Sequence, residues 1–248
     1  MDDAVNLEGN VALVTGAARR VGRAFALELA ARGADLIVLY RARAPEALEV
    51  VGQAAKLGRR AVALRAEVSH AKEVSALVSE ALREFGRLDI LVNNASIFSR
   101  TPFAEMSEQD WDRLLDVNLK GAFLFARAAA PTMLRQGAGK IINIADITRD
   151  KPVKGYLAYS VSKAGLVTLT KALAVELAPS VQVNAIGPGP VLFPEDFSED
   201  LKAKVIARTP LKRTGSPEDI ARAVRFLIEE GDFITGILLP VDGGMSVR

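Results

Sequence analysis

Short apolar runs alternate along the chain with longer segments in which apolar residues return every three or four positions. The runs are rich in Val, Ile and Leu and predict buried strands, whereas the longer segments predict helices. Strands that alternate with helices form a parallel sheet through right-handed crossovers, with helices on both faces. The runs lie at 11–15, 35–40, 60–67, 88–92, 141–146, 181–187 and 236–241. The pattern therefore predicts an α/β fold with a doubly wound sheet.

One segment follows no clear period. It runs from Val191 to Gly215 and mixes aromatic, proline and acidic residues. An aperiodic stretch of this length inside a compact domain is usually functional or mobile, so we expect a substrate lid at about 190–215. Ser216 follows it, and the proline and two acids after that serine predict the start of another helix.

Composition narrows the class of protein. The 248 residues are half hydrophobic, which fits a single domain over 1–248, and 32 basic against 30 acidic residues give a net charge of +2. No Lys/Arg-rich tract occurs, so nucleic acid is not an expected partner. The chain has no cysteine, no signal-peptide pattern and no apolar run of membrane-spanning length, so we expect a cytoplasmic protein without a membrane partner. The single histidine, His70, has no partner motif, and neither histidine catalysis nor a metal site is expected.

A glycine-containing turn joins the first predicted strand to the first helix. Gly16 permits a tight turn after the strand, and Gly22 allows the helix to lie close to the strand. Strand, glycine turn and helix in this order form a phosphate-binding unit. The middle glycine of the usual dinucleotide fingerprint is missing, so an ordinary strand-to-helix turn remains an alternative.

Arginines stand at the end of the second predicted strand. Sites that prefer NAD usually place an acid there for the ribose 2′-hydroxyl, but this chain has Tyr40, Arg41 and Arg43. With Arg19 in the glycine turn, these guanidinium groups suit a 2′-phosphate, which indicates NADP. The alternative is that the arginines only solvate a loop.

The stretch from Ile141 to Lys163 is the candidate for the chemistry. Tyr159 and Lys163 are four residues apart and share one face of a predicted helix, and Asp146 ends the preceding apolar run. An ammonium near a phenol favours the phenolate, so we expect the pKa of Tyr159 to lie below its ordinary value of about 10. The same spacing is also found in solvated surface pairs.

Three polar residues follow the fourth predicted strand. Asn93, Asn94 and Ser96 stand where an open α/β sheet binds its ligands, although asparagine is also common in plain turns. Asn118 lies on a long apolar helix, where a buried amide needs partners and could order a water or kink the helix.

Together these motifs resemble the short-chain dehydrogenase/reductase family over essentially the whole chain. The resemblance rests on Thr15-Gly16 with Gly22, Asn93-Asn94-Ala95, Asn118, Tyr159 with Lys163, Pro188-Gly189 and the end Val241-Asp242-Gly243-Gly244. It implies a single-domain Rossmann-type sheet of seven parallel strands and NAD(P) as hydride carrier. It also implies a homotetramer, with Tyr159 as proton donor, Lys163 on the nicotinamide ribose, and Asn118 supporting a water relay.

Three departures from the general family pattern resemble the pteridine and dihydromonapterin reductases. Asp146 replaces a serine that usually binds the substrate carbonyl, Arg20 replaces a glycine, and Ser96 with Phe98 follows the asparagines. In that subgroup the arginine lies between cofactor phosphates and pterin, the phenylalanine stacks on the pterin, and the aspartate helps to protonate a ring nitrogen. Taken singly, each residue could instead be a turn residue, a surface cation or a core aromatic.

The sequence therefore predicts an NADPH-dependent reductase of a dihydropterin-like C=N bond, with a planar pterin as the small-molecule substrate. The alternatives are a carbonyl reductase acting on a 3-oxoacyl compound or another ketone, and a non-catalytic NADPH-binding module. The expected catalytic residues are Asp146, Tyr159, Lys163 and Asn118. The expected NADP contacts are Gly16, Arg19, Arg20, Val21, Gly22, Tyr40, Arg41, Glu67, Val68, Asn94, Ala95, Ser96, Tyr159, Lys163, Pro188, Gly189 and Val191. The expected substrate contacts are Arg20, Ser96, Phe98, Asp146, Tyr159, Gly189 and Leu192.

Overall fold

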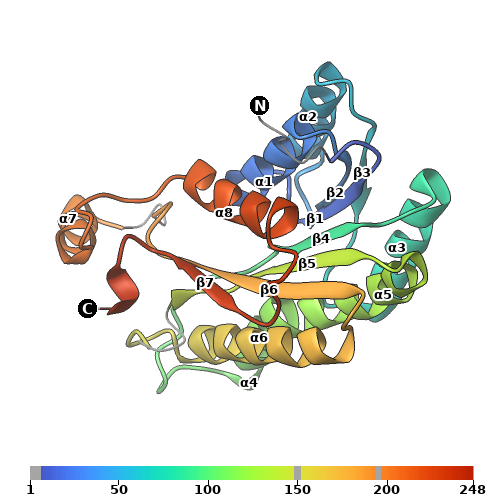
Figure 1. Cartoon of the computed structure of the whole chain (residues 1–248). Helices are drawn as coiled ribbons and strands as arrows, with labels where there is room; N and C mark the ends of the chain where they lie inside the picture. The colour runs from blue at the N-terminus through green and yellow to red at the C-terminus, as the bar shows by residue number, and fades with distance from the viewer. Residues whose placement is uncertain (1–6, 148–151, 194–196, 248) are drawn as a thin grey trace.

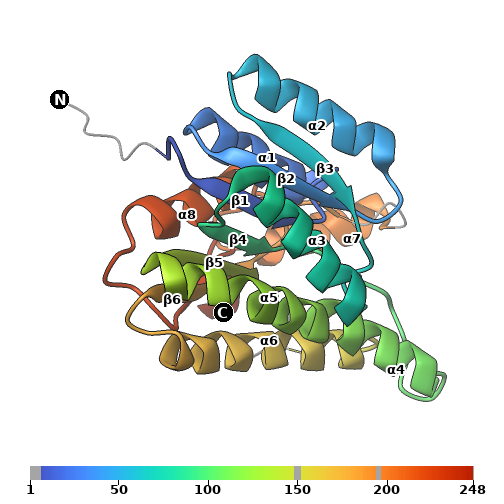
Figure 2. The ribbon, with the colours of Figure 1, turned by 90° about the vertical axis from the view of Figure 1, so that its right-hand side faces the viewer.

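The computed structural model describes residues 7–147, 152–193 and 197–247, and they form one parallel sheet of seven strands with helices on both faces (Figures 1 and 2). The strand order is β3-β2-β1-β4-β5-β6-β7. The strands are β1 Val11–Thr15, β2 Asp35–Tyr40, β3 Ala61–Arg65, β4 Ile90–Asn93, β5 Gly139–Ile144, β6 Val181–Pro188 and β7 Leu238–Val241. The doubly wound α/β sheet predicted from the apolar runs is confirmed, with strand ends that shift by one or two residues, and so is the Rossmann-type sheet of seven parallel strands implied by the family resemblance.

Two helical layers cover the sheet (Figure 1). Helices α1, α2 and α8 pack on one face, and α3, α5 and α6 pack on the other. The helices are α1 Arg20–Ala31, α2 Ala44–Lys56, α3 Ala71–Phe85, α4 Glu108–Leu115, α5 Gly121–Gln136, α6 Leu157–Glu176, α7 Glu199–Arg208 and α8 Pro217–Glu229. Side chains of β1 alternate between the two layers, with Ala12 and Val14 in one core cluster and Val11 and Leu13 in the other. Because both faces are covered, the strand is apolar throughout rather than alternating.

The strand order reverses at β1, which pairs with β2 on one side and β4 on the other. In open parallel sheets, a crevice forms at such a reversal, outside the carboxyl ends of the two strands. The glycine turn after Thr15 and the asparagines at the end of β4, Asn93 and Asn94, both lie at these ends. The topology therefore brings two predicted motifs to one place.

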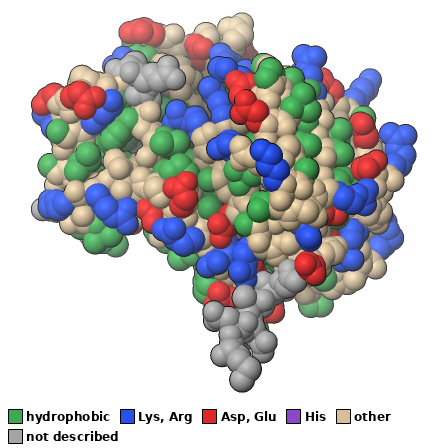
Figure 3. All heavy atoms as spheres, turned by 90° about the horizontal axis from the view of Figure 1, so that it is seen from above, with side chains coloured by type: hydrophobic (Ala, Val, Ile, Leu, Met, Phe, Trp, Pro, Cys, Tyr) green, Lys and Arg blue, Asp and Glu red, His purple; other side chains and the backbone are tan. Residues whose placement is uncertain are grey.

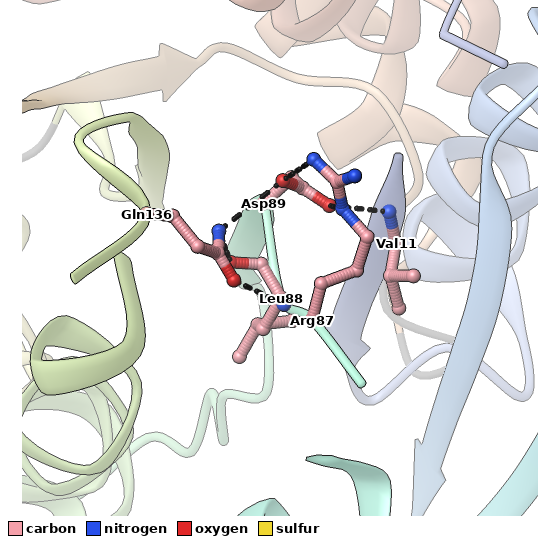
Figure 4. Close-up of polar contacts among 5 residues, drawn as sticks. All are labelled: Val11, Arg87, Leu88, Asp89 and Gln136. Atoms are coloured by element: carbon pink, nitrogen blue, oxygen red, sulfur yellow. Dashed lines mark hydrogen bonds and ion pairs between the residues drawn. The ribbon is translucent and has the colours of Figure 1, made fainter. Parts of the chain in front are cut away.

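The opposite ends of β1 and β4 are held by a carboxylate (Figure 4). Asp89 accepts hydrogen bonds from the Val11 amide at 2.8 Å and from both ends of the Arg87 guanidinium fork at 2.8 Å. Gln136, at the end of α5, donates to Asp89 at 3.3 Å and to the Leu88 carbonyl at 3.0 Å. This network fixes the register of the two strands on the side away from the crevice.

Two helical features differ from the sequence prediction. The long helix expected around Asn118 contains a π-helical turn at Asp116–Lys120 between α4 and α5. The stretch expected to lack a period contains α7, whose first turn is capped by the Ser198 hydroxyl. Residues 194–196 of the expected lid segment lie outside the described residues.

Surface features agree with a mixed charge distribution. On the face seen in Figure 3, basic and acidic side chains are interspersed rather than gathered in one field. His70 is exposed at the N-terminal end of α3, where its ring pairs with Glu73 at 2.7 Å. None of the helices in the described part of the chain combines the length and the apolar composition needed to cross a membrane.

Candidate active site

The glycine turn and the end of β4 are bound together closely. Thr15 Oγ1 accepts hydrogen bonds from the amides of Asn94 and Ala95, both at 2.9 Å. The Asn94 side chain donates to the carbonyls of Thr15 at 2.8 Å and Gly16 at 3.2 Å. A Cβ at Gly22 would overlap the Gly16 carbonyl oxygen and lie 2.5 Å from Asn94 Nδ2. The turn therefore requires glycine at position 22, as predicted from the sequence.

The N-terminal end of α1 is electropositive. Its first turn contains no acid, and Arg19 and Arg20 are both exposed there. Arg20 has a φ of 53°, a left-handed conformation in which most residues other than glycine are strained. Its Nη2 donates to the Leu192 carbonyl at 3.1 Å. The arginine thus links the glycine turn to the predicted lid segment.

Arg41, which is expected to bind the 2′-phosphate, forms an ion pair with Glu67. Arg41 Nη1 lies 3.4 Å from Glu67 Oε2, and the Arg41 side chain is 58% exposed. Arg65, at the end of β3, donates from Nε to the Arg41 carbonyl at 3.1 Å. Tyr40 is half-buried at the end of β2. An exposed pair of this kind is weak, so the guanidinium of Arg41 can exchange Glu67 for a phosphate.

The catalytic candidates meet between β5 and α6. The Tyr159 hydroxyl donates to Asp146 Oδ2 at 2.7 Å, and Lys163 Nζ donates to the Ile144 carbonyl at 2.7 Å. Tyr159 and Lys163 are almost completely buried, whereas Asp146 is half-buried. The structure therefore joins two residues that the sequence separates by thirteen positions.

Burial controls the proton affinities of this group. The pKa of Tyr159 is raised well above 10, first by burial and then by the negative charge and the hydrogen bond of Asp146. Burial lowers the pKa of Lys163 to about 8, partly offset by Asp146. The expectation that the pKa of Tyr159 would lie below its ordinary value is wrong for this arrangement, because burial, together with the charge and hydrogen bond of Asp146, favours the neutral phenol. The ammonium lies 5.9 Å from the centroid of the phenol ring.

The side chain of Asn118 is fully used within the protein. Its Oδ1 accepts from the Ile97 amide at 2.8 Å and the Ser96 hydroxyl at 3.1 Å. Its Nδ2 donates to the Ile97 carbonyl at 3.0 Å and Ser162 Oγ at 3.1 Å. An amide offers two donors and two acceptor positions, so this side chain is saturated and braces the π-helical turn against α6. A water relay through the side chain itself, one use the sequence suggested, does not fit.

Phe98 faces a tyrosine that the sequence did not single out. Its ring stacks on Tyr156, with centroids 4.5 Å apart and planes inclined by 14°, and meets Tyr159 edge-on at 4.8 Å. Phe98 is 48% exposed, so part of the ring remains open to a ligand. The signal for Tyr156 was its position three residues before Tyr159, one helical turn away. Ser162 was also missed, although a serine on an apolar helix face invites a search for its partner.

The remaining predicted residues lie around the same crevice. Gly189 follows β6, and a Cβ there would lie 2.6 Å from the Asp242 backbone. Val68 contacts Gly121 and lines a small cavity together with Thr15, Ala95 and Asn118. Val21, Pro188, Val191 and Leu192 are half-buried or exposed. Within the described part of the chain, Arg41 and Glu67 form hydrogen bonds with each other, with Arg65 and with Glu73 of α3, and these contacts do not reach Tyr159.

The chain is similar to known proteins over nearly its whole length. Residues 16–246 match the family model described as "Enoyl-(Acyl carrier protein) reductase". The chain is 42% identical to a 3-oxoacyl-(acyl-carrier-protein) reductase of Synechocystis, covering 96% of this chain and 98% of that protein. It is 40% identical to the 3-oxoacyl-(acyl-carrier-protein) reductase FabG of Staphylococcus aureus, covering 94% and 97%.

Solved structures give the same result. A putative short-chain alcohol dehydrogenase from Sinorhizobium meliloti superposes with a TM-score of 0.94 at 35% identity, covering 99% of both chains. A putative gluconate dehydrogenase from Agrobacterium tumefaciens superposes with a TM-score of 0.93 at 36% identity, again over 99% of both chains.

Proposed function

The chain belongs to the short-chain dehydrogenase/reductase family and is an oxidoreductase, and we propose that it is an NADPH-dependent reductase of a ketone such as a 3-oxoacyl compound. The observation that carries this substrate class is the 42% identity, over 96% of the chain, to a protein named as a 3-oxoacyl-(acyl-carrier-protein) reductase. The sequence motifs favour a dihydropterin over a ketone. The relatives reverse that order.

The residues of the crevice fit a nicotinamide dinucleotide. Gly22 lets the start of α1 lie against the Gly16 carbonyl, where a Cβ would collide. The first turn of α1 contains no acidic residue, so its N-terminal amides are available to a phosphate. Arg19 and Arg41 would hold the 2′-phosphate that distinguishes NADP, and Lys163 would hold the nicotinamide ribose. The backbone near Asn94, Ala95, Ser96, Pro188, Gly189 and Val191 would line the rest of the cofactor. When bound, NADPH supplies the hydride.

The residues between β5 and α6 supply the proton. The raised pKa of Tyr159 keeps its hydroxyl protonated at neutral pH, so the phenol can donate to a substrate oxygen as negative charge develops there. Lys163 has a pKa of about 8 and is largely an ammonium at pH 7, which stabilises the phenolate left behind. Asn118 and Ser162 brace the helix that carries both residues.

A dihydropterin-like substrate is the second candidate, and the Asp146–Tyr159 hydrogen bond favours it. Asp146 Oδ2 accepts from the tyrosine, whereas a serine at this position would offer a hydroxyl donor to a carbonyl oxygen. Reduction of a C=N bond needs a proton at nitrogen, and the Asp146–Tyr159 pair could deliver it. The open part of the Phe98 ring, backed by Tyr156, suits a planar heterocycle.

A substrate panel separates the two candidates. NADPH and NADH oxidation would be measured with acetoacetyl thioesters, simple ketones, dihydrobiopterin and dihydrofolate. The ketone proposal expects turnover of the ketones with NADPH preferred, and Asp146→Ser should keep or increase it. Turnover confined to the pterins and abolished by Asp146→Ser would overturn the ketone proposal and establish the pterin. Equal rates with NADH would contradict the roles of Arg19 and Arg41.

The lid and the assembly remain predictions. We propose that 190–215 closes over the substrate within a single domain, and the Arg20–Leu192 bond supports a link between this segment and the cofactor turn. A cytoplasmic location and a homotetramer are further expectations, to be tested by fractionation and by light scattering.

A further inference from the structure

A chain of buried amides and a hydroxyl runs from the sheet into α6. Asn93 and Asn143 are register partners on β4 and β5, and Asn93 Nδ2 donates to Asn143 Oδ1 at 2.9 Å. Asn143 Nδ2 then donates to Thr170 Oγ1 at 2.9 Å. Thr170 Oγ1 in turn donates to the Leu166 carbonyl at 2.8 Å. Asn143 and Thr170 are both fully buried, and Asn93 is 5% exposed.

The helix that receives this chain has no single apolar face. Leu166 and Val167 of α6 are buried against the sheet, but Leu157, Val161 and Val175 are apolar and exposed. The buried residues of α6 recur every three or four positions, but apolar residues outside this stripe weaken the contrast between its faces, so hydrophobic burial alone specifies the rotation of the helix weakly. Directional polar contacts must therefore set its rotation and its position along the strand, as a buried asparagine sets register in a coiled coil.

Three polar contacts between β5 and α6 occur in antiparallel order. Tyr159 meets Asp146, Lys163 meets the Ile144 carbonyl, and Thr170 meets Asn143. Thr170 lies seven residues beyond Lys163, which is two turns, or about 10.5 Å, further along the same side of the helix. The first two contacts contain the catalytic candidates, which must exchange partners during a reaction. The Asn143–Thr170 contact contains neither catalytic candidate, and both of its side chains are fully buried.

We propose that the Asn143–Thr170 hydrogen bond is a positioning contact that holds α6 in the rotation and axial position at which Tyr159 and Lys163 reach the strand. This inference rests on the proposed function for its kinetic part. Neither residue touches the reacting atoms, so both act through the helix. A small displacement of a catalytic group lowers turnover strongly, which gives the contact a measurable consequence.

Thr170→Val tests the bond, because valine keeps the shape and removes only the hydroxyl. The expected result is a fall in kcat of about tenfold or more, with little change in KM for NADPH, and an altered pH–rate profile. Thr170→Ser restores the hydroxyl and should recover wild-type kcat. Thr168→Val is the matched control, since Thr168 lies on the same helix and donates to the Ala164 carbonyl but is exposed.

A second measurement does not depend on turnover. Lys163 is 3% exposed, so its acetylation by a water-soluble reagent reports how well α6 keeps it against the strand. Measured by mass spectrometry relative to exposed Lys171 on the same helix, labelling should increase severalfold in Thr170→Val and stay unchanged in Thr168→Val. A wild-type protein that reduces neither ketones nor pterins would refute the proposed function and leave the labelling test in force.

Two outcomes would overturn the positioning role of the Asn143–Thr170 hydrogen bond. One is a Thr170→Val protein with wild-type kcat, pH–rate profile and Lys163 labelling, whatever its melting temperature. Another is a Thr170→Ser protein that loses as much kcat as Thr170→Val, because the methyl group rather than the hydrogen bond would then matter. Thr170→Ser keeps the hydroxyl and so provides this test even if the valine variant fails to fold.

Discussion

Lys163 is a buried ionisable group, and its burial should make the free energy of unfolding depend on pH. The side chain is 3% exposed, and its charge is offset only in part by Asp146. Its pKa falls from an ordinary 10.5 to about 8 in the folded protein. The folded state therefore binds the proton more weakly than the unfolded chain, so stability should rise with pH between about 8 and 10.5.

The magnitude follows from the shift. One pKa unit corresponds to about 1.4 kcal/mol, so the ammonium destabilises the folded protein by about 3 kcal/mol at pH 7. From pH 7.5 to 9.5 about 2 kcal/mol of this penalty should disappear. The raised pKa of Tyr159 acts in the opposite sense, because its stabilising effect is present below pH 10 and lost above it. The measurement should therefore end at pH 9.5.

Replacement of Lys163 by methionine isolates the effect. The free energy of unfolding would be measured with urea at pH 7.5 and 9.5 for both proteins, and wild type minus Lys163→Met should rise by about 2 kcal/mol over this interval. Lys171→Met, exposed on the same helix, should leave the wild-type pH dependence unaltered. A difference that stays constant with pH would show that Lys163 is not held in the buried environment described here.

Three further predictions concern the turn, the strand ends and the proton donor. Gly22→Ala should unfold the protein or abolish NADPH binding measured by fluorescence, because the added Cβ would collide with the Gly16 carbonyl. Gly52→Ala is the control: it has open space around the added Cβ in α2 and should raise the melting temperature slightly. A Gly22→Ala protein with normal stability and NADPH binding would contradict the close contact between Gly22 and the Gly16 carbonyl. Asp89→Ala should lower the free energy of unfolding, measured with urea, by about 2–3 kcal/mol, because it leaves the partners of the carboxylate unpaired. Asp232→Ala is the control: its side chain is 85% exposed, and the loss should be less than about 1 kcal/mol. Equal losses in the two variants would refute the role of the buried carboxylate. Tyr159→Phe should reduce turnover by about 10²- to 10⁴-fold while NADPH binding persists, and unchanged turnover would remove Tyr159 as the acid.

Local signals explain the parts that sequence alone predicted well. The apolar runs predicted the strands because both faces of the sheet are covered, and burial of every position leaves an uninterrupted run. Ser216 and the residues that follow it predicted a helix start because such signals lie within a few positions of each other, and the structure contains a capping box between Ser216 and Asp219. The lack of space for a side chain at Gly22 was also predictable, because the strand, turn and helix that surround it are adjacent in the sequence.

Other features depended on contacts between distant segments. The π-helical turn at Asp116–Lys120 accompanies hydrogen bonds from Asn118 to Ile97 and Ser162, and nothing in the local sequence distinguishes it from α-helix. Helix α7 was missed because it buries none of its residues, so its sequence shows no apolar stripe.

The sequence by itself determined the order of strands and helices, the glycine turn and the pair of Tyr159 with Lys163, because each depends on residues close together in the chain. Tertiary structure decided the proton affinities, because the partner of Tyr159 is a carboxylate at the end of β5 and both groups on α6 are buried. It also decided which buried polar residues hold α6, since Asn143 and Thr170 are 27 positions apart and their hydrogen bond exists only where helix and sheet meet.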